Sequence, residues 1–333
     1  METRQLGKSD VHVSALGLGC WPLGGGPGWG DQDLADSIGA VHAALDMGIT
    51  LFDSAEAYND GHSEEVLGLA LHGRRSEAII ATKVSPDNTA PATLRAHCEA
   101  SLRRLGTDYI DLYQVHWPIT GHSLADAMAT LQDLKHEGKI RAIGVSNFGT
   151  FDLPETLATG APIACNQLNY SLVFRAIELA ILPMCQANSI SVLAYMPLMQ
   201  GLLVGQWTHA DQVPEFRGRT RHFSSQRPGV RHGEPGVEHF TFAAVERIRV
   251  IAAQAGMTMP DLALAWVMAR PGVGSVLMGG RKASQIERNA QAARRPLSAD
   301  LVAALDAATD DLRKALGPNA DAFQGAQGTR IRF

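Results

Sequence analysis

Apolar, strand-like runs that stop on a polar residue recur at near-regular spacing in this chain, and this recurrence limits the possible folds most strongly. Leu51-Phe52 ends on Asp53, a second run carries Lys83, and a third stops on His116. Each gap between these runs holds a helical pattern of apolar residues. Strands that alternate with helices form parallel sheets, and the carboxyl ends of parallel strands share one face. We therefore expect Asp53, Lys83 and His116 to lie close together.

The same alternation continues to the end of the chain and predicts eight strands. They span residues 15–20, 49–53, 78–84, 109–116, 140–145, 163–168, 190–195 and 274–278. Helical patterns separate them, over residues 33–48, from 63, 91–105, from 123, 153–159, 182–188, 242–255, 260–270, from 284 and 299–316. Eight such units in 333 residues favour a closed (β/α)8 TIM barrel, an α/β fold formed as a single domain over residues 1–333.

Three further segments frame this barrel. Residues 4–6 and 11–13 flank a turn-rich tetrapeptide and predict an N-terminal β-hairpin. A long irregular loop over 201–240 follows strand seven, and we hypothesise that it folds over a bound cofactor as a lid. An open doubly wound sheet is the alternative fold, but it needs a G-x-G-x-x-G fingerprint after its first strand. The glycine cluster found there lacks that spacing, and we interpret it as a flexible loop: Gly24, Gly25, Gly26 and Gly28.

Charge and cysteine content argue against several classes of function. The formal net charge of −5 disfavours a nucleic-acid partner, which usually requires a basic face. All apolar runs are shorter than the about 18 residues of a membrane-spanning helix, and the N-terminus lacks the layout of an export signal. The 4 cysteines are widely spaced and form no metal-binding pattern. We therefore expect no metal site, no membrane partner and a cytoplasmic location.

The predicted strand ends carry polar and aromatic side chains on the face where TIM barrels place their chemistry. These residues are Trp21, Asp53, Lys83, His116, Asn147, Gln167, Tyr195 and Arg281. Taken singly, each is more often structural, since a buried Asp and Lys commonly form an ion pair and a histidine before Trp-Pro commonly packs in a turn. The coincidence of Asp, Lys and His at three consecutive strand ends favours a reaction site.

Tyr58, in the loop after Asp53, completes a set that can deliver a proton. A tyrosine hydroxyl has a pKa of about 10, and we expect the Lys83 ammonium to lower it toward neutral pH. Asp53 would hold Lys83 and keep it charged, and His116 could hydrogen-bond a carbonyl oxygen. No Ser or Cys nucleophile accompanies these groups, so the missing component is a hydride donor, which side chains cannot supply.

The turn after the last strand predicts where such a donor binds. Gly279-Gly280 allows close approach of the backbone to a ligand, and Arg281 and Lys282 add positive charge. Ser284-x-x-Glu287 matches a capping box, which predicts a helix start whose free amides point at an anion. A basic pair there suits the 2′-phosphate of NADP, although a solvated charge pair is the alternative interpretation.

With these residues assembled, the chain resembles the aldo-keto reductases over essentially its whole length. The run Phe52-Asp53-Ser54-Ala55-Glu56-Ala57-Tyr58 and the run over 61–68 resemble the family's best-known signature. Ile143-Gly144-Val145-Ser146-Asn147-Phe148 and the run over 197–203 resemble cofactor-binding segments. The resemblance implies a TIM barrel, NADP(H) as cofactor, and a catalytic tetrad formed by Asp53, Tyr58, Lys83 and His116.

The resemblance also implies the contacts to cofactor and substrate. The nicotinamide would be bound at its amide by Ser146, Asn147 and Gln167 and stacked on by Tyr195. The pyrophosphate would lie under a loop that holds Pro197, Leu198, Gln200 and Gly201. The adenosine phosphate would be held by Gly280, Arg281, Gln285 and Asn289. The substrate pocket would be lined by Trp21, Tyr58 and His116.

The predicted function is hydride transfer between NADP(H) and an aldehyde or ketone, or the corresponding alcohol, with Tyr58 as proton donor. One alternative is an NAD-dependent dehydrogenase of a sugar or of pyridoxal. Another is a cofactor-binding redox sensor or regulatory subunit, like the channel-associated members of the same family. A third is a phosphate-binding barrel enzyme without redox chemistry. For the reductase and for the dehydrogenase, the expected partner is a small carbonyl compound or alcohol.

Overall fold

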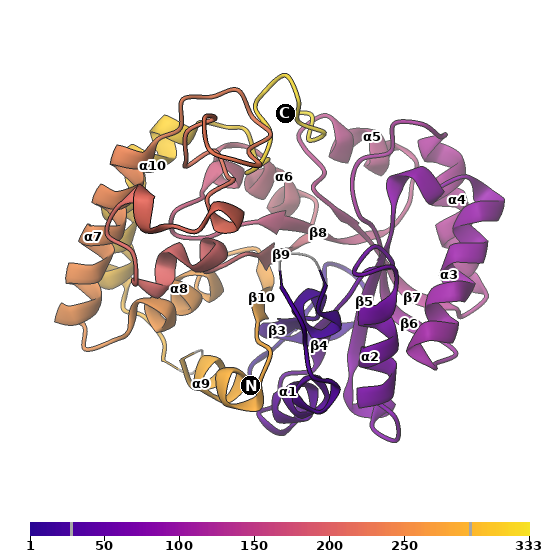
Figure 1. Cartoon of the computed structure of the whole chain (residues 1–333). Coiled ribbons are helices and arrows are strands. Elements are labelled where there is room, and N and C mark those ends of the chain that lie inside the picture. Colours follow the sequence, from indigo (N-terminus) through magenta and orange to yellow (C-terminus); the bar gives the residue numbers. More distant parts are fainter. Residues whose placement is uncertain (27–28, 293–294) are drawn as a thin grey trace.

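Eight parallel strands close into a barrel in the computed structural model, which describes residues 1–26, 29–292 and 295–333 (Figure 1). Gly28 of the glycine cluster lies outside these residues. Neighbouring strands follow chain order, and the last pairs with the first to complete the barrel. The strands are β3 (Leu16–Gly19), β4 (Leu51–Asp53), β5 (Ile79–Val84), β6 (Ile110–Val115), β7 (Ile140–Ser146), β8 (Ile163–Asn169), β9 (Ser191–Tyr195) and β10 (Val273–Gly279). The predicted TIM barrel is thereby confirmed, and the open sheet is not formed.

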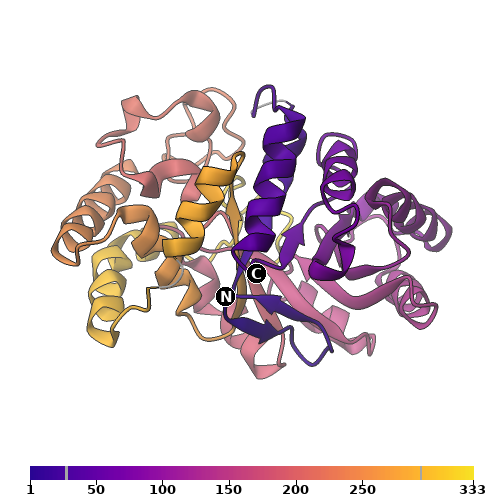
Figure 2. The same ribbon diagram turned by 90° about the horizontal axis from the view of Figure 1, so that it is seen from below.

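Helices surround the barrel and occupy the gaps between its strands (Figures 1 and 2). They are α1 (Leu34–Asp46), α2 (His62–Ala70), α3 (Pro91–Leu105), α4 (Leu124–His136), α5 (Asp152–Ala158), α6 (Ile181–Ala187), α7 (Glu238–Gln254), α8 (Met259–Met268), α9 (Ala283–Ala292) and α10 (Ala299–Leu316). Short 3-10 turns are η1 (Trp21–Gly24), η2 (Arg75–Glu77), η3 (Pro86–Asn88), η4 (Ala176–Leu179), η5 (Met199–Val204), η6 (Ala210–Gln212) and η7 (Glu215–Arg217).

One predicted helix start is right and one is wrong. Ser123 caps α4, because its hydroxyl oxygen accepts a hydrogen bond of 3.2 Å from the amide of Asp126. The capping box predicted at Ser284 is not formed, since α9 already begins at Ala283 and Ser284 lies inside its first turn. The Gln285 side chain instead accepts a hydrogen bond of 2.8 Å from the Arg281 amide at this turn.

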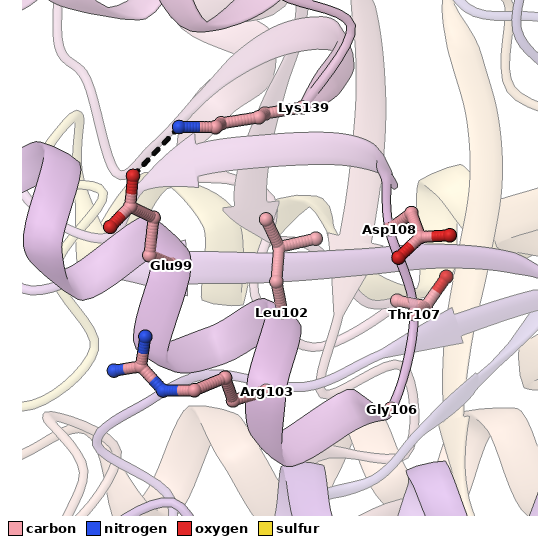
Figure 3. A pocket seen from close by; sticks show the side chains of 7 residues that line it. All are labelled: Glu99, Leu102, Arg103, Gly106, Thr107, Asp108 and Lys139. Carbon is pink, nitrogen blue, oxygen red and sulfur yellow. Dashed lines mark hydrogen bonds and ion pairs between the residues drawn. The ribbon is translucent and has the colours of Figure 1, made fainter.

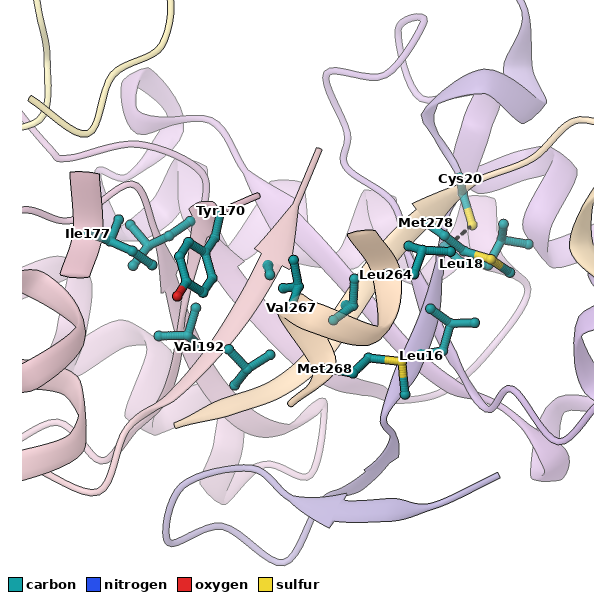
Figure 4. Packing of buried hydrophobic residues seen from close by; sticks show 14 of the residues in the cluster. Leu16, Leu18, Cys20, Tyr170, Ile177, Val192, Leu264, Val267, Met268 and Met278 are labelled. Atoms are coloured by element: carbon teal, nitrogen blue, oxygen red, sulfur yellow. Dashed lines mark hydrogen bonds between the residues drawn. The ribbon is translucent and has the colours of Figure 1, made fainter. Parts of the chain in front are cut away.

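The main hydrophobic core lies between the barrel and its helices. In Figure 4, Leu264 and Met268 of α8 lie beside Leu16 and Leu18 of β3 and Met278 of β10. All of these side chains are buried or nearly so, and burial of one such side chain stabilises the fold by about 1.5–3 kcal/mol. This packing fixes the seam where the last strand meets the first, and so it fixes the strand ends that carry the predicted site.

The predicted N-terminal hairpin closes the lower end of the barrel (Figure 2). Strands β1 (Thr3–Gln5) and β2 (His12–Ser14) pair antiparallel, with Arg4 opposite Val13. The apolar side chains of the hairpin join the barrel interior in a second core cluster with Leu51 and Leu112. Because these side chains fill this end, we expect a ligand to approach the barrel from the opposite face, where the strands end.

The segment 201–240 is irregular and packs against the C-terminal tail at the upper end of the molecule (Figure 1). Arg221 joins the two, since its amide donates to the Ala322 carbonyl at 2.7 Å. Its guanidinium donates to the Asn319 and Leu316 carbonyls at 3.0 and 2.7 Å. The predicted long loop after the seventh barrel strand is therefore held in place by the tail.

Among the described residues, no single helix is long and apolar enough to cross a membrane; α7 and α8 meet that length and composition only as a pair bent by 96°. Within the same part of the chain, no group of three or more His, Cys, Asp or Glu side chains is arranged to hold a metal ion.

Candidate active site

The ends of β4 and β5 bring Asp53, Lys83 and Tyr58 into one hydrogen-bonded group. The Lys83 Nζ atom donates to Asp53 Oδ2 at 2.6 Å, to the Ser54 carbonyl at 2.8 Å and to the Tyr58 hydroxyl at 3.2 Å. Lys83 is fully buried and Asp53 is 3% exposed. All three ammonium protons have an acceptor, so the charge on Lys83 is fixed beside the phenol oxygen. The grouping predicted from the strand ends is formed.

Two glutamines hold the other oxygen of Asp53. Gln114 and Gln167 donate to Asp53 Oδ1 at 3.2 and 2.8 Å, and the Gln167 amide also donates to Gln114 Oε1 at 3.2 Å. Gln167, one of the predicted nicotinamide contacts, is therefore also hydrogen-bonded to Asp53. Gln114 is not among the predicted site residues, although its position two residues before His116 on a buried strand indicates the same inward direction.

Burial and neighbouring charges together shift the pKa values of the site. Burial raises the pKa of the Tyr58 hydroxyl, and the Lys83 ammonium only partly opposes that rise. The lowered pKa expected from Lys83 alone is thus wrong for the net effect. Burial alone would lower the pKa of Lys83, but Asp53 and Tyr58 outweigh it, and the pKa is raised. Burial and the positive charges of Lys83 and Arg330 hold the pKa of His116 well below its ordinary value, so its imidazole is neutral.

Two aromatic rings pack against the ring of Tyr58, and a third packs against one of them. The Trp21 ring stacks on Tyr58 with 5.5 Å between ring centroids, and His116 meets Tyr58 edge-on at 5.7 Å. Trp29 meets Trp21 edge-on at 5.6 Å. Trp21 lies next to Tyr58 as the pocket prediction requires, and its exposed fraction of 42% leaves a face open to a ligand. Trp29 was missed, because it follows a glycine-rich segment with no periodic pattern.

The ends of β7, β8 and β9 bring Ser146, Asn147, Gln167 and Tyr195 together. Asn147 has a left-handed φ of 64°, which turns its side chain back toward His116, and its Nδ2 atom donates to the His116 carbonyl at 3.2 Å. The Tyr195 hydroxyl donates to Asn147 Oδ1 at 2.8 Å. The Ser146 hydroxyl donates to the Gln167 carbonyl at 3.1 Å. The predicted nicotinamide contacts are therefore adjacent to His116.

The loop after β9 turns sharply at Gln200 and Gly201, with φ angles of 52° and 100°. Pro197 and Leu198 lead into this turn, and the Gly201 amide donates to the Leu198 carbonyl at 3.0 Å. Gln200 Oε1 and both side-chain polar atoms of Asn169, at the end of β8, are buried without a hydrogen-bond partner among the described residues. Unpaired buried polar groups are costly and mark places where a ligand can supply partners.

The turn after β10 holds Arg281 in contacts within the chain. The Arg281 guanidinium donates to Gln32 Oε1 at 2.5 Å, to the Trp29 carbonyl at 2.8 Å and to the Asp31 carbonyl. In return, the Gln32 amide donates to the Arg281 carbonyl at 3.0 Å. The Asn289 amide donates to the Gly279 carbonyl at 3.4 Å. The predicted adenosine-phosphate residues thus lie together at one turn, but the Arg281 guanidinium is largely occupied by the 29–32 segment.

Two hollows on the surface lie away from this group. The larger, of about 460 Å³, is drawn in Figure 3. It is lined by Glu99, Leu102, Arg103, Gly106, Thr107, Asp108 and Lys139. The smaller, of about 360 Å³, lies beside the N-terminal hairpin and is lined in part by Arg4 and Gln5. No predicted site residue lines either hollow. Chemistry, rather than the size of a surface hollow, identifies the candidate site.

Comparison with known proteins gives one consistent result. The family model described as "Aldo/keto reductase family" matches residues 15–310. The chain is 35% identical to aldo-keto reductase YhdN of Bacillus subtilis (strain 168), over 86% of this chain and 87% of that one. It is 35% identical to an NADH-specific methylglyoxal reductase of Escherichia coli (strain K12), over 88% and 93%. An aldo-keto reductase of Klebsiella pneumoniae solved in complex with NADPH has a TM-score of 0.72 and 31% identity, with full coverage of both chains.

Proposed function

Because the chain belongs to the aldo/keto reductase family of oxidoreductases, we propose that it reduces aldehydes or ketones with NADP(H) and that Tyr58 donates the proton. Family membership establishes the coarser activity, which is hydride transfer between a nicotinamide cofactor and a carbonyl compound or alcohol. One observation carries the residue roles: the Lys83 ammonium bonds both the Tyr58 hydroxyl and Asp53, at 3.2 and 2.6 Å.

The four residues act on the carbonyl oxygen. The nicotinamide, when bound, supplies the hydride to the carbonyl carbon. Tyr58 hydrogen-bonds the carbonyl oxygen and gives it a proton as negative charge develops there. The Lys83 ammonium stabilises the phenolate that remains, and Asp53 keeps Lys83 charged and in place. The neutral imidazole of His116 provides a second hydrogen bond to the carbonyl oxygen, without competing for the proton that Tyr58 transfers.

The chain's own geometry supports a nicotinamide cofactor along the strand ends. Its amide would bind Ser146, Asn147 and Gln167, and its ring would lie against Tyr195. The pyrophosphate would meet the turn of Pro197, Leu198, Gln200 and Gly201. The unpaired Asn169 Nδ2 atom, at the end of β8, is a donor that could bind an oxygen of the cofactor. The adenosine phosphate would lie at Gly280, Arg281, Gln285 and Asn289. The irregular loop over 201–240 would cover the bound cofactor.

The preference for NADP over NAD is the finer part of this proposal. Arg281 supports it, because a guanidinium is the side chain best suited to a phosphate. To bind a 2′-phosphate, Arg281 would have to exchange some of its contacts with Gln32, Trp29 and Asp31. NAD is therefore the second candidate, and the 35% identical E. coli relative is described as NADH-specific.

We further propose that the chain acts as one domain in the cytoplasm on a small carbonyl compound or alcohol. The closed barrel, whose hairpin and tail both pack against it, supports a single unit. All four cysteines are buried free thiols, which suits a reducing compartment.

A Tyr58→Phe variant tests the proposed function. It should lose nearly all turnover of NADPH with an aldehyde while binding NADPH as tightly as the wild type, measured by quenching of protein fluorescence. Tyr109→Phe, which removes the same hydroxyl from a tyrosine outside the site, is the matched control and should keep full activity. The substrate panel should include methylglyoxal, sugars, pyridoxal and simple ketones, each with NADPH and NADH.

Three results would contradict the proposal at different levels. Wild-type kcat in Tyr58→Phe would remove the proton-donor role. Cofactor binding with no oxidation by any member of the panel would favour a sensor. Absence of binding by either cofactor would favour a phosphate-binding barrel enzyme outside redox chemistry.

A further inference from the structure

The last residues of the chain are docked beside the site by a set of specific contacts. The Arg332 guanidinium pairs with Asp152 Oδ1 at 2.5 Å, and the Arg332 amide donates to Asp152 Oδ2 at 3.1 Å. The Phe151 amide donates to the Arg332 carbonyl at 3.2 Å, and Ile331 is fully buried. A Cβ atom on Gly149 would lie 2.0 Å from the Arg332 carbonyl oxygen. Only glycine at this position lets the tail approach so closely.

This docking holds the C-terminal tail at the upper end of the molecule (Figure 1), and Arg330 of this tail lies over the Trp117 ring. The Cζ atom of its guanidinium lies 3.8 Å from the centroid of the Trp117 ring, and Trp117 directly follows His116. The positive charge of Arg330 helps to lower the pKa of His116 and acts against the raised pKa of Tyr195. The charge of Arg330 thus acts on His116, the proposed carbonyl-binding residue, and on Tyr195, the proposed nicotinamide-stacking residue.

The carboxylates that act on the charge of Arg330, Asp321 and Asp87, lie beyond ion-pair distance in the part of the chain that the structure describes. Two other arginines of the same region have carboxylate partners, Arg332 with Asp152 and Arg221 with Glu234 at 2.8 Å. Arg330 forms no such ion pair, and no hydrogen bond from its guanidinium to the described residues is formed. A guanidinium stacked through its face on an aromatic ring keeps its N–H groups, which lie in the plane of the guanidinium, free for a ligand.

A second unpaired arginine strengthens the positive potential. Arg231, from the 201–240 loop, lies over the Phe323 ring at 5.9 Å and has no carboxylate partner among the described residues. Burial and the charge of Arg231 lower the pKa of Arg330, although Asp321 partly opposes them. Two cations that are held on aromatic rings, and that form no ion pair with the described residues, favour binding of an anion between the tail and the site.

We propose that Arg330 binds a carboxylate on the carbonyl substrate, so that the enzyme selects carbonyl compounds that carry a carboxylate. This inference rests on the proposed function and names the substrate class of that same site. The planar fork of a guanidinium matches the two oxygens of a carboxylate. Stacking on the Trp117 ring holds the Arg330 guanidinium in place. The docked residues Ile331 and Arg332 hold the backbone that carries it.

A matched pair of aldehydes tests the proposal. 4-Carboxybenzaldehyde and its methyl ester, methyl 4-formylbenzoate, share the reacting group and nearly the same shape but differ in charge. For the wild type with NADPH, kcat/KM should be about tenfold higher for the acid, as for one charge-assisted hydrogen-bonded contact that is partly open to water. Arg330→Met should remove that preference by raising KM for the acid, with the ester unchanged.

Two further variants separate binding from general effects. Arg330→Lys keeps the charge but loses the fork, and should retain only part of the preference. Arg313→Met removes one positive charge from the surface of α10, where Arg313 pairs with Asp310 at 2.6 Å, and should leave the preference intact. Equal losses on acid and ester in Arg330→Met, or a wild-type preference for the ester, would overturn the inference.

Benzoate binding distinguishes failure of this inference from failure of the proposed function. The probe is benzoate added to the protein with bound NADP, with benzyl alcohol as the neutral control, followed by protein fluorescence. Wild type should bind benzoate about tenfold more tightly than Arg330→Met does. If neither aldehyde is reduced but benzoate binding still depends on Arg330, the proposed function fails and the anion site stands. Benzoate affinity that is the same in both proteins would remove the anion site.

Discussion

Replacement of Lys83 by methionine should destabilise the protein strongly, because it leaves a buried carboxylate without its counter-charge. Asp53 is 3% exposed, and its Oδ2 atom accepts its hydrogen bond from Lys83 at 2.6 Å. After the change, the Gln114 and Gln167 amides, both on Oδ1, would be the remaining donors to this carboxylate among the described residues. Breaking a buried ion pair from one side costs about 3–5 kcal/mol. We expect Lys83→Met to lose a free energy of unfolding in this range.

The double variant Asp53→Asn/Lys83→Met completes the measurement. It removes both charges, and so it should be more stable than Lys83→Met alone by about 2 kcal/mol or more. Urea unfolding followed by circular dichroism gives the free energy for wild type, both single variants and the double variant. A loss below about 1 kcal/mol in Lys83→Met, or strict additivity of the two single changes, would refute the view that this pair is coupled.

A surface pair provides the control for this cycle. Lys139 pairs with Glu99 at 2.7 Å, with side chains 30% and 41% exposed. Lys139→Met should lose no more than about 1 kcal/mol, because exposed pairs gain little from mutual attraction. A similar cost at both positions would show that burial does not set the strength of the Asp53–Lys83 interaction.

Three other predictions concern His222 in the 201–240 loop, Gly149 beside the C-terminal tail, and Gln32 beside Arg281. Burial lowers the pKa of His222 to about 4, so the unfolded chain takes up this proton first and stability should fall as the pH drops from about 6.5 to 4. Urea midpoints at pH 7 and 5 should differ less in His222→Gln than in wild type, and equal differences would contradict this. Gly149→Ala should displace the tail and speed tryptic cleavage after Arg330, read by mass spectrometry; an unchanged rate would show that the tail is not held there. Gln32→Ala should free Arg281 and tighten NADPH relative to NADH by about 3- to 10-fold in fluorescence titrations, whereas equal shifts for both cofactors would dissociate Gln32 from the phosphate site.

The barrel could be predicted from sequence because each strand is short, apolar and closed by a polar stop. Lys83 and His116 illustrate this, since both lie at strand ends and both reach the same face. The ends of helices have weaker signals in the sequence than the strands have. α9 begins at Ala283 rather than at the predicted Ser284, and the Gln285 side chain accepts from the Arg281 amide just before it.

Parts of the site had no local signal in the sequence. Burial and the Lys83 charge shift the pKa of Tyr58 in opposite directions. The sequence does not show which of the two effects is larger. Trp29 lies near the site through contacts between segments far apart in the sequence, among them the hydrogen bond from Arg281 to the Trp29 carbonyl. Arg330 lies in a tail without a periodic pattern. Its place beside Trp117 depends on contacts of the tail with α5, which is distant in the sequence, such as that of Arg332 with Asp152.

The seam of the barrel sets the order in which the chain can complete its fold. β10 pairs with β3, so that Val276 lies opposite Leu16. While a ribosome is still making the chain, the strands from β3 to β9 can assemble in order, but both outer strands keep unpaired edges until residue 279 has emerged. Such edges are open to pairing with other chains. A truncated product that ends before β10 should therefore aggregate, and early binding by a chaperone would protect mainly β3 and β9.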